Sequence, residues 1–173
     1  MAELVVVTGP PGAGKSTVAK AVAGRFERSA LVAGDDFFAF IDQGYISPWT
    51  QAAHHQNDVV VGAAAAAAGR LAAGGYTVVY DGVIGPWFVD AFAAATGLAG
   101  YHYVVLLPDE DVCVERVGSR TGHGFTDLDA TRHMYREFAE SAVEERHVLR
   151  TVSAPEDLAS SIVERVLDGS LRR

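Results

Sequence analysis

A glycine-rich segment near the N-terminus has the residue types and spacing that bind phosphate. It reads Gly9-Pro10-Pro11-Gly12-Ala13-Gly14-Lys15-Ser16, which fits the pattern G-x-x-x-x-G-K-[ST] without deviation. Glycines let the backbone curl so that successive N–H groups point inward at the phosphates of a nucleotide. Lys15 adds a mobile positive charge, and the hydroxyl of Ser16 can ligate Mg²⁺. We therefore predict that this segment, with the neighbouring Thr17, binds ATP and Mg²⁺.

The surroundings of this segment support the same interpretation. An apolar run, Leu4–Thr8, predicts a buried strand before it, and the pattern of Lys15–Phe26 predicts a helix after it. The N-terminus of that helix would add the positive end of its dipole to the phosphate site. The alternative is a glycine-rich turn that precedes a helix by chance, and the complete motif between a strand and a helix argues against it.

Two adjacent aspartates, Asp35 and Asp36, follow the next apolar run along the chain. In open parallel sheets, ligands bind beyond the carboxyl ends of the strands. A phosphoryl acceptor needs its hydroxyl oriented in line with the γ-phosphate, and a carboxylate that accepts its proton. We expect at least one of the pair to contact the acceptor, while the other caps the next segment or faces solvent.

A third aspartate, Asp81, ends the apolar run Val78-Val79-Tyr80. An acid at the end of such a strand orients the magnesium ion in P-loop proteins. The alternative is a turn aspartate before Gly82, because Asp-Gly is a common turn signal. We favour a functional role, and the spacing leaves open whether Asp81 serves the metal or the acceptor.

Four arginines bracket a glycine-containing loop at residues 121–125. Arg116 and Arg120 precede it at helical spacing, and Arg132 and Arg136 follow it with the same spacing. Arginines around a loop that closes over ATP would neutralise the charge spreading over the transferred phosphoryl group. The alternative is i,i+4 pairing with acids on the same helices. We expect a lid at about 116–136, with Arg120 as the preferred catalytic arginine.

The segment 37–56 is an insert without clear periodicity, and it is richer in aromatic residues than a plain connection requires. Together with Trp87, these side chains predict a largely apolar acceptor pocket with a few polar anchors. The alternative is that the insert packs down on the sheet without binding a ligand. The aromatic residues of the insert are Phe37, Phe38, Phe40, Tyr45 and Trp49.

The remaining pattern alternates strands and helices, which predicts βαβ units and a parallel sheet. We expect an α/β fold in one domain, 1–173: a three-layer P-loop NTPase with a five-stranded parallel sheet and a helical lid. The expected strands are 4–8, 30–33, 76–80, 101–107 and 150–153. The expected helices are 15–26, 58–73, 86–95, 109–120, 127–148 and 155–167.

Composition limits the classes of partner. The 173 residues carry 22 acids and 14 bases, a formal net charge of −8, so no electrostatic footprint for duplex nucleic acid or anionic membrane is present. The lone Cys113 excludes an intramolecular disulfide and fits a reducing compartment. The apolar stretch 59–68 is too short to span a bilayer, and no targeting pattern precedes the first strand. We expect a soluble cytoplasmic protein; nothing in the sequence supports an oligomer.

Over nearly its whole length the chain resembles the small P-loop kinases, which include chloramphenicol phosphotransferase, gluconate kinase, adenylylsulfate kinase, the zeta toxins and polynucleotide kinase. The resemblance is carried by the phosphate loop, the acids after the second and third strands, and the arginine-bearing lid. These kinases share an Asp-x-apolar triplet whose aspartate is the base or orients the acceptor. Asp35-Asp36-Phe37 matches it, which favours Asp35 over Asp36. The resemblance also implies that residues 151–155 surround the adenine.

The chain departs from each of these kinases in its acceptor motifs. Gluconate kinase's His-Pro after the acid and the adenylylsulfate kinase motifs are missing. Chloramphenicol phosphotransferase is nearest in layout, but its insert differs. We therefore expect a kinase for a small hydroxylated molecule. A hydroxylated antibiotic is the leading acceptor, a metabolic sugar or nucleoside is the rival, and an ATP-dependent switch is the alternative from another class. We expect the acceptor to contact Asp35, Asp36, Phe37, Trp49, Asp81, Trp87 and Arg136.

Overall fold

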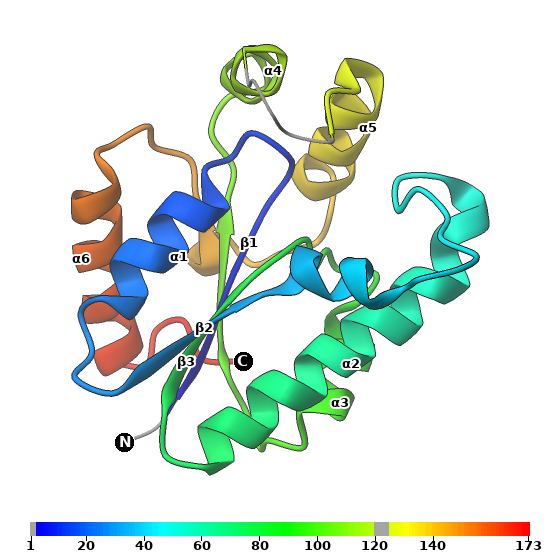
Figure 1. The fold of residues 1–173 in the computed structure, drawn as a ribbon. Coiled ribbons are helices and arrows are strands. Elements are labelled where there is room, and N and C mark those ends of the chain that lie inside the picture. The colour runs from blue at the N-terminus through cyan, green and yellow to red at the C-terminus, as the bar shows by residue number, and fades with distance from the viewer. Residues whose placement is uncertain (1–2, 120–124) are drawn as a thin grey trace.

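The centre of the molecule is a five-stranded parallel sheet with the order β2-β3-β1-β4-β5. The computed structural model describes residues 3–119 and 125–173. Val7 of β1 and Ala33 of β2 both pair with Asp81 of β3, so these three strands end at one level (Figure 1). The strands are β1 (Leu4–Thr8), β2 (Ser29–Ala33), β3 (Thr77–Asp81), β4 (His102–Leu106) and β5 (Val148–Leu149).

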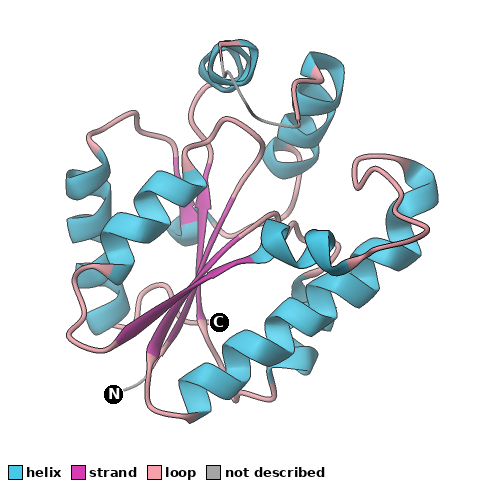
Figure 2. Ribbon diagram, viewed as in Figure 1, coloured by secondary structure: helices cyan, strands magenta, loops and turns pink. Residues whose placement is uncertain are grey.

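Helices cover both faces of the sheet and make a three-layer architecture (Figure 2). One face carries α1 (Lys15–Ala23) and α6 (Pro155–Leu167), and the other carries α2 (His54–Ala73) and α3 (Val89–Thr96). Two further helices, α4 (Glu110–Gly118) and α5 (Leu128–Ala139), lie beyond the carboxyl ends of the strands.

The strands are apolar along their whole length because helices cover both of their faces. All five residues of β1 are buried, as are all five of β3 and of β4. One apolar cluster lies between the sheet and α2 with α3, and a second lies between the sheet and α1 with α6. Cys113 of α4 belongs to the second cluster and is fully buried. None of the described helices is long and apolar enough to cross a membrane.

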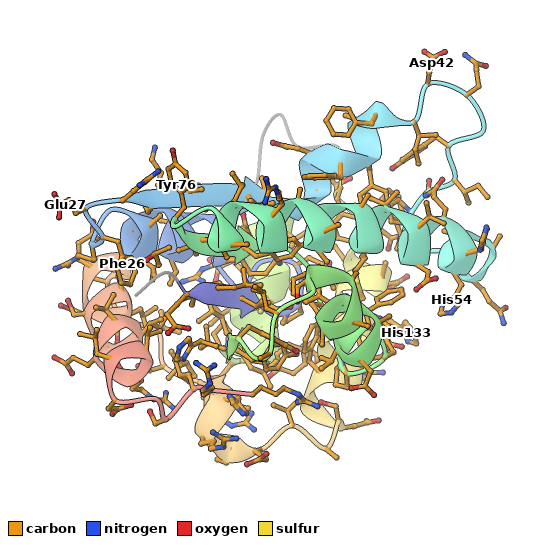
Figure 3. All side chains as sticks on the ribbon, turned by 90° about the horizontal axis from the view of Figure 1, so that it is seen from below. Phe26, Glu27, Asp42, His54, Tyr76 and His133 are labelled. Carbon is orange, nitrogen blue, oxygen red and sulfur yellow. The ribbon has the colours of Figure 1, made fainter. Side chains whose placement is uncertain are left out.

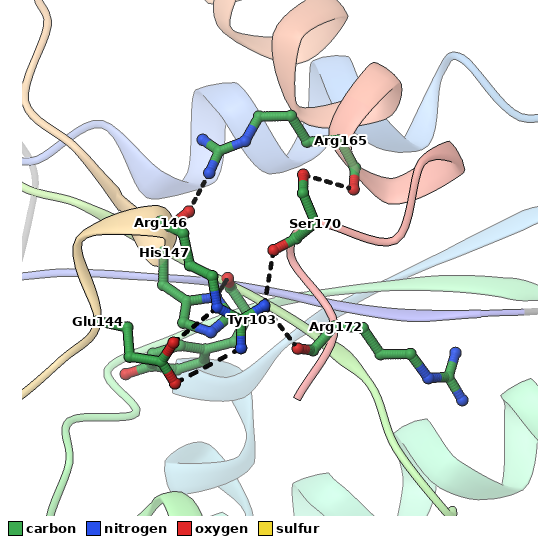
Figure 4. A network of polar contacts seen from close by, with 7 residues as sticks. All are labelled: Tyr103, Glu144, Arg146, His147, Arg165, Ser170 and Arg172. Carbon is green, nitrogen blue, oxygen red and sulfur yellow. Dashed lines mark hydrogen bonds and ion pairs between the residues drawn. The ribbon is translucent and has the colours of Figure 1, made fainter.

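The C-terminal segment closes the amino end of the sheet. Backbone hydrogen bonds join Tyr101 and Arg173 in both directions, at 3.2 and 2.8 Å. Arg146 donates to the carbonyl oxygens of Ser170 and Arg172 at 2.8 and 3.1 Å and pairs with Glu144 at 2.8 Å (Figure 4). Every one of these contacts lies at the end of the sheet opposite the phosphate loop.

The predicted helix 127–148 and strand 150–153 were wrong in extent and position. Helix α5 ends at Ala139, and Ser141 then donates its hydroxyl to the carbonyl oxygen of Phe138 at 2.6 Å. A 3-10 turn, η3 (Glu145–His147), leads into β5, which pairs with Val105 and Leu106 of β4. The helix stops early because the chain must return to the edge of the sheet.

Two other predicted helices begin at different residues. The predicted start at Pro86 was wrong, since Phe88 donates its backbone N–H to Gly85 in a turn and α3 begins at Val89. Helix α2 begins at His54 instead of residue 58. The insert 37–56 is partly regular: 3-10 segments η1 (Gly34–Phe40) and η2 (Gln51–Ala53) occupy its two ends.

Candidate active site

The glycine-rich segment forms a tight loop between β1 and α1. Gly9 and Gly12 have φ angles of 142° and 81°, which side chains rarely adopt. A β-carbon at Gly9 would meet the carbonyl oxygen of Leu106, and one at Gly12 would meet that of Cys113. The loop is therefore held against β4 and α4 in a conformation that only glycine permits, and this curl is the shape of a phosphate cradle.

Two cations lie at this loop. The Nζ of Lys15 donates to the carbonyl oxygen of Pro10 at 3.1 Å. Arg116 reaches over from α4, and its Nη1 donates to the carbonyl oxygen of Gly12 at 3.3 Å. Lys15 and Arg116, two of the three predicted nucleotide-binding cations, thus lie at the loop. The third, Arg120, lies outside the described residues, as do Gly122 and His123.

Asp81 is a buried carboxylate directly beside this loop. Its side chain accepts a hydrogen bond from Ser16 at the start of α1, and its residue is 9% exposed. Burial raises the pKa of Asp81, the Ser16 hydrogen bond and the Lys15 charge lower it, and the charges of Asp35 and Asp36 raise it further. The Ser16 hydroxyl and the Asp81 carboxylate are hard oxygen donors of the kind that Mg²⁺ prefers.

These two donors fit Mg²⁺ as partial ligands. No group of three or more His, Cys, Asp or Glu is placed to hold a metal among residues 3–119 and 125–173. Magnesium sites in kinases take one or two protein ligands and complete the shell with phosphate oxygens and water. The donor set here matches that type of site and not an all-protein cage.

The two strand-end aspartates both lie in η1 but differ in their relation to the cavity. Asp35 lines the cavity next to the phosphate loop, and Asp36 is not among the lining residues. Gly34, just before them, is buried against Tyr80, and a β-carbon there would overlap the tyrosine hydroxyl. The structure thus brings Asp35, and not Asp36, to the cavity that holds the loop.

Tyr80 is a residue of the site that the sequence reasoning missed. Its side chain is 2% exposed, lines the cavity, and experiences the charges of both Asp35 and Asp81. Burial, and then those two charges, raise its pKa, so the phenol stays protonated and remains a hydrogen-bond donor. The available signal was a tyrosine next to the acid at the end of an apolar strand.

The cavity has a volume of about 1310 Å³ and runs from the phosphate loop to an aromatic wall. Trp49 of the insert meets the ring of Phe125 edge-on at 4.9 Å, so the insert contacts the segment before α5. Trp87 meets Phe138 of α5 at 5.5 Å. Both predicted tryptophans line the cavity, as do the predicted Lys15, Ser16 and Asp35.

Polar residues line the same cavity from two helices. His54, at the start of α2, stacks on Phe88 with ring centroids 5.7 Å apart. His133 of α5 lies on the same side of the molecule, whereas Asp42 projects at the tip of the insert (Figure 3). Asn57 and Glu137 also line the cavity. The sequence reasoning did not single out Asn57, His133 or Glu137, because it began α2 four residues too late and assigned α5 only to the lid.

Three further residues expected at the acceptor are not in the cavity lining: Phe37, Arg136 and Asp81, which bonds to Ser16 instead. Phe37 packs against the core cluster and meets Phe40 at 5.5 Å, while Phe38 takes the place on the cavity. Arg136 pairs with Glu110 of α4, with its Nη2 3.9 Å from the Oε1 of that glutamate. Arg136 is not among the lining residues, because its charge serves the contact between α5 and α4.

A parallel sheet flanked by helices, with a phosphate loop after the first strand and an acid after the third, defines a P-loop protein of the small-kinase type. The sequence profile described as an AAA domain matches residues 4–165. The chain therefore belongs to that family. A comparison with curated protein sequences found no significant match.

Solved structures share this fold along nearly their whole length. A tunicamycin resistance protein from Deinococcus radiodurans has 14% identity and a TM-score of 0.71, covering 96% of each chain. A gluconokinase from Sinorhizobium meliloti has 21% identity and a TM-score of 0.65, covering 97% of this chain and 94% of its own. A shikimate kinase from Acinetobacter baumannii, solved with shikimate, has 18% identity and a TM-score of 0.61, covering 99% and 96%. Two of these three neighbours are small-molecule kinases, the class that the sequence resemblance predicted.

Proposed function

We propose that this protein is an ATP-dependent phosphotransferase that moves the γ-phosphoryl group to a hydroxyl group of a small molecule. One observation carries the proposal: the phosphate loop and the strand-end carboxylate Asp35 line the same cavity. Its volume of about 1310 Å³ exceeds the roughly 300–1,000 Å³ of ordinary ligand pockets. The cavity therefore has room for a nucleotide and an acceptor side by side.

The loop end of the cavity would hold the nucleotide. Backbone N–H groups of the loop and the ammonium of Lys15 would bind the β- and γ-phosphates, with Arg116 beside them. Ser16 and Asp81 would hold Mg²⁺, which neutralises phosphate charge when bound. Arg120 remains our proposed lid arginine for the charge that develops on the transferred group.

The transfer step follows from the position of Asp35. The hydroxyl oxygen of the acceptor attacks the γ-phosphorus, and the bond from that phosphorus to the β,γ-bridging oxygen breaks. ADP leaves with that oxygen, and the hydroxyl proton passes to the carboxylate of Asp35. Tyr80, a protonated phenol that experiences the charge of Asp35, would offer a hydrogen bond to that carboxylate. Most of the rate enhancement would then come from positioning and electrostatics.

The leading acceptor in our proposal is a hydroxylated antibiotic, and the rival is a metabolic sugar or nucleoside. The aromatic wall supports the first, because a cavity with two tryptophans and several phenylalanines suits a molecule with a large apolar surface. A tunicamycin resistance protein and a gluconokinase both share the fold. The fold is therefore compatible with either acceptor.

An ADP-release screen over hydroxylated antibiotics, nucleosides and sugars tests the proposal. A kinase releases ADP quickly only when the right acceptor is present, whereas a nucleotide-dependent switch shows no stimulation by any small molecule. Asp35→Asn should lower transfer by about 10²–10⁴-fold, the usual contribution of a general base, with ATP affinity nearly intact. Asp36→Asn is the matched control, and equal losses in the two variants would remove Asp35 from its role.

A further inference from the structure

We propose that the acceptor carries no negative charge: it is a hydroxylated molecule with a flat apolar face that is either neutral or bears a basic nitrogen. This inference rests on the proposed function, because it assumes that the aromatic half of the cavity receives the acceptor. Two observations carry it: the aromatic wall and the sign of the charges along the cavity.

The aromatic wall selects for a flat apolar face. Trp49 and Trp87 line the cavity together with Phe38, Phe88 and Phe125. Aromatic rings bind flat apolar surfaces by stacking and edge contacts, and such surfaces include the C–H faces of sugars and other rings. A small, fully hydrated polyol gains little from such a wall, so the apolar face must be a substantial part of the acceptor.

The charges along the cavity disfavour an anion. Among the described residues, Lys15 is the only lysine or arginine in the lining, and it belongs to the phosphate loop. The lining carboxylates are Asp35 and Glu137. The two α5 arginines, Arg132 and Arg136, both pair with Glu110 at 3.9 Å and are not in the lining.

These charges make the binding of an anionic acceptor unfavourable. Its charge would lose water among aromatic rings, where the described lining offers the imidazoles of His54 and His133 but no second lysine or arginine. It would also approach two carboxylates. The γ-phosphate of bound ATP adds negative charge while occupying Lys15. A basic nitrogen, in contrast, has a partner: the Oε1 of Glu137 lies 3.7 Å from the Nε2 of His133 and is partly exposed at the cavity. A ligand ammonium would replace that histidine contact.

Intrinsic fluorescence can report acceptor binding without any turnover, because the chain has two tryptophans and both line the cavity. We would titrate the full chain, with Mg²⁺ and ADP, with three matched triplets of hydroxylated compounds. They are built on a cyclohexyl pyranoside, a ribonucleoside and an arylpropanediol. Within each triplet the members differ only in one substituent: a carboxylate, a carboxamide or an amine.

In at least one triplet, we expect the carboxamide and the amine to quench the tryptophans at concentrations at least tenfold below those of the carboxylate. Glu137→Gln should remove any preference for the amine over the carboxamide, and Glu140→Gln on the same helix should leave it unchanged. Equal or tighter binding of the carboxylates, or no binding by any triplet, would overturn the inference.

The two proposals fail in different ways. If the neutral compounds bind but none accelerates ADP release, the proposed phosphotransferase activity is wrong and the proposed charge preference stands. If carboxylated compounds bind equally well and are phosphorylated, the phosphotransferase stands and the charge preference is wrong.

Discussion

The two ends of the central sheet differ in the surroundings of their charged side chains. At the amino end, Arg146 is held by Glu144 and by two carbonyl oxygens of the C-terminal segment. At the carboxyl end, the Asp81 carboxylate is buried next to a cavity, and its pKa is raised by that burial and by the charges of two further aspartates. The Arg146 charge thus has partners within the protein, whereas the carboxyl end holds charge that a ligand would relieve.

This difference separates residues that stabilise the fold from residues that would do the chemistry. Carboxylates crowded at a cavity destabilise the folded chain, and such cost is common at functional sites. Substitutions at the amino end should therefore change stability without changing turnover, and substitutions at the carboxyl end should change turnover with little loss of stability. Four variants test this comparison.

Lys15→Ala should have the largest effect. Removing the ammonium at the phosphate loop should lower acceptor-dependent ADP release by about 10³-fold, which corresponds to roughly 4 kcal/mol of transition-state stabilisation. The control is Lys20→Ala, because Lys20 is exposed on the same helix. Steady-state kinetics measure both variants, and similar losses would show that the effect is not specific to the loop.

Leu171→Ala, at the amino end of the sheet, should lower the free energy of unfolding without lowering turnover. Leu171 is fully buried in the cluster that contains Ile162 and Val166, and truncation of a buried leucine costs about 2–4 kcal/mol. Urea unfolding should show this loss, while turnover of the folded protein stays unchanged. Leu167→Ala is the control because Leu167 is 77% exposed. If turnover also falls at a temperature where the variant is folded, the expected separation between stabilising residues and functional residues is wrong.

Asp81→Asn should lower turnover and raise stability together. Loss of the proposed magnesium ligand should cost about 10²-fold in rate. Because burial raises the pKa of Asp81 in the folded chain, the folded state holds the proton more tightly, and the free energy of unfolding falls as pH rises from the ordinary aspartate range through the raised pKa.

The asparagine variant lacks that penalty. Its melting temperature without ligand should exceed that of the parent by a few degrees at pH 7.5, and the two should converge at low pH. Thermal unfolding monitored by circular dichroism across pH provides the measurement. If the variant melts below the parent at neutral pH, Asp81 stabilises the folded chain and the expected penalty is wrong.

Tyr80→Phe should have the smallest effect. Removal of the hydroxyl, which experiences the charges of Asp35 and Asp81, should lower kcat about tenfold because a buried donor near the proposed base is lost, with the KM for ATP unchanged. The pH dependence of kcat should also shift, because a donor near the base is gone. Tyr76→Phe at the distant end of β3 is the control. An unchanged kcat and pH profile would limit Tyr80 to packing.

Much of the fold and the nucleotide half of the site followed from the sequence. The phosphate loop has a local signature, because its conformation depends on glycines that no other residue replaces. The continuous apolar runs predicted a sheet that helices cover on both faces. Asp81 could be placed because a strand-end acid needs only the strand boundary to be known.

The proposed acceptor half of the site depends on tertiary contacts that local patterns do not encode. The resemblance favoured Asp35 over Asp36, but only the 3-10 turn of η1 shows which of them lines the cavity. Arg136 was expected at the acceptor, yet the packing of α5 on α4 places it beside Glu110. The end of α5 likewise follows from the pairing of β5 with β4.

The contact between Gly34 and Tyr80 has an evolutionary consequence. Because the tyrosine hydroxyl fills the space that a β-carbon would need at position 34, the two positions cannot vary independently. Homologous chains that keep tyrosine at 80 should keep glycine at 34, and chains with a much shorter side chain at 80 should accept alanine or serine there. Covariation between these two alignment columns would therefore mark the lineage that shares this geometry beside the proposed base.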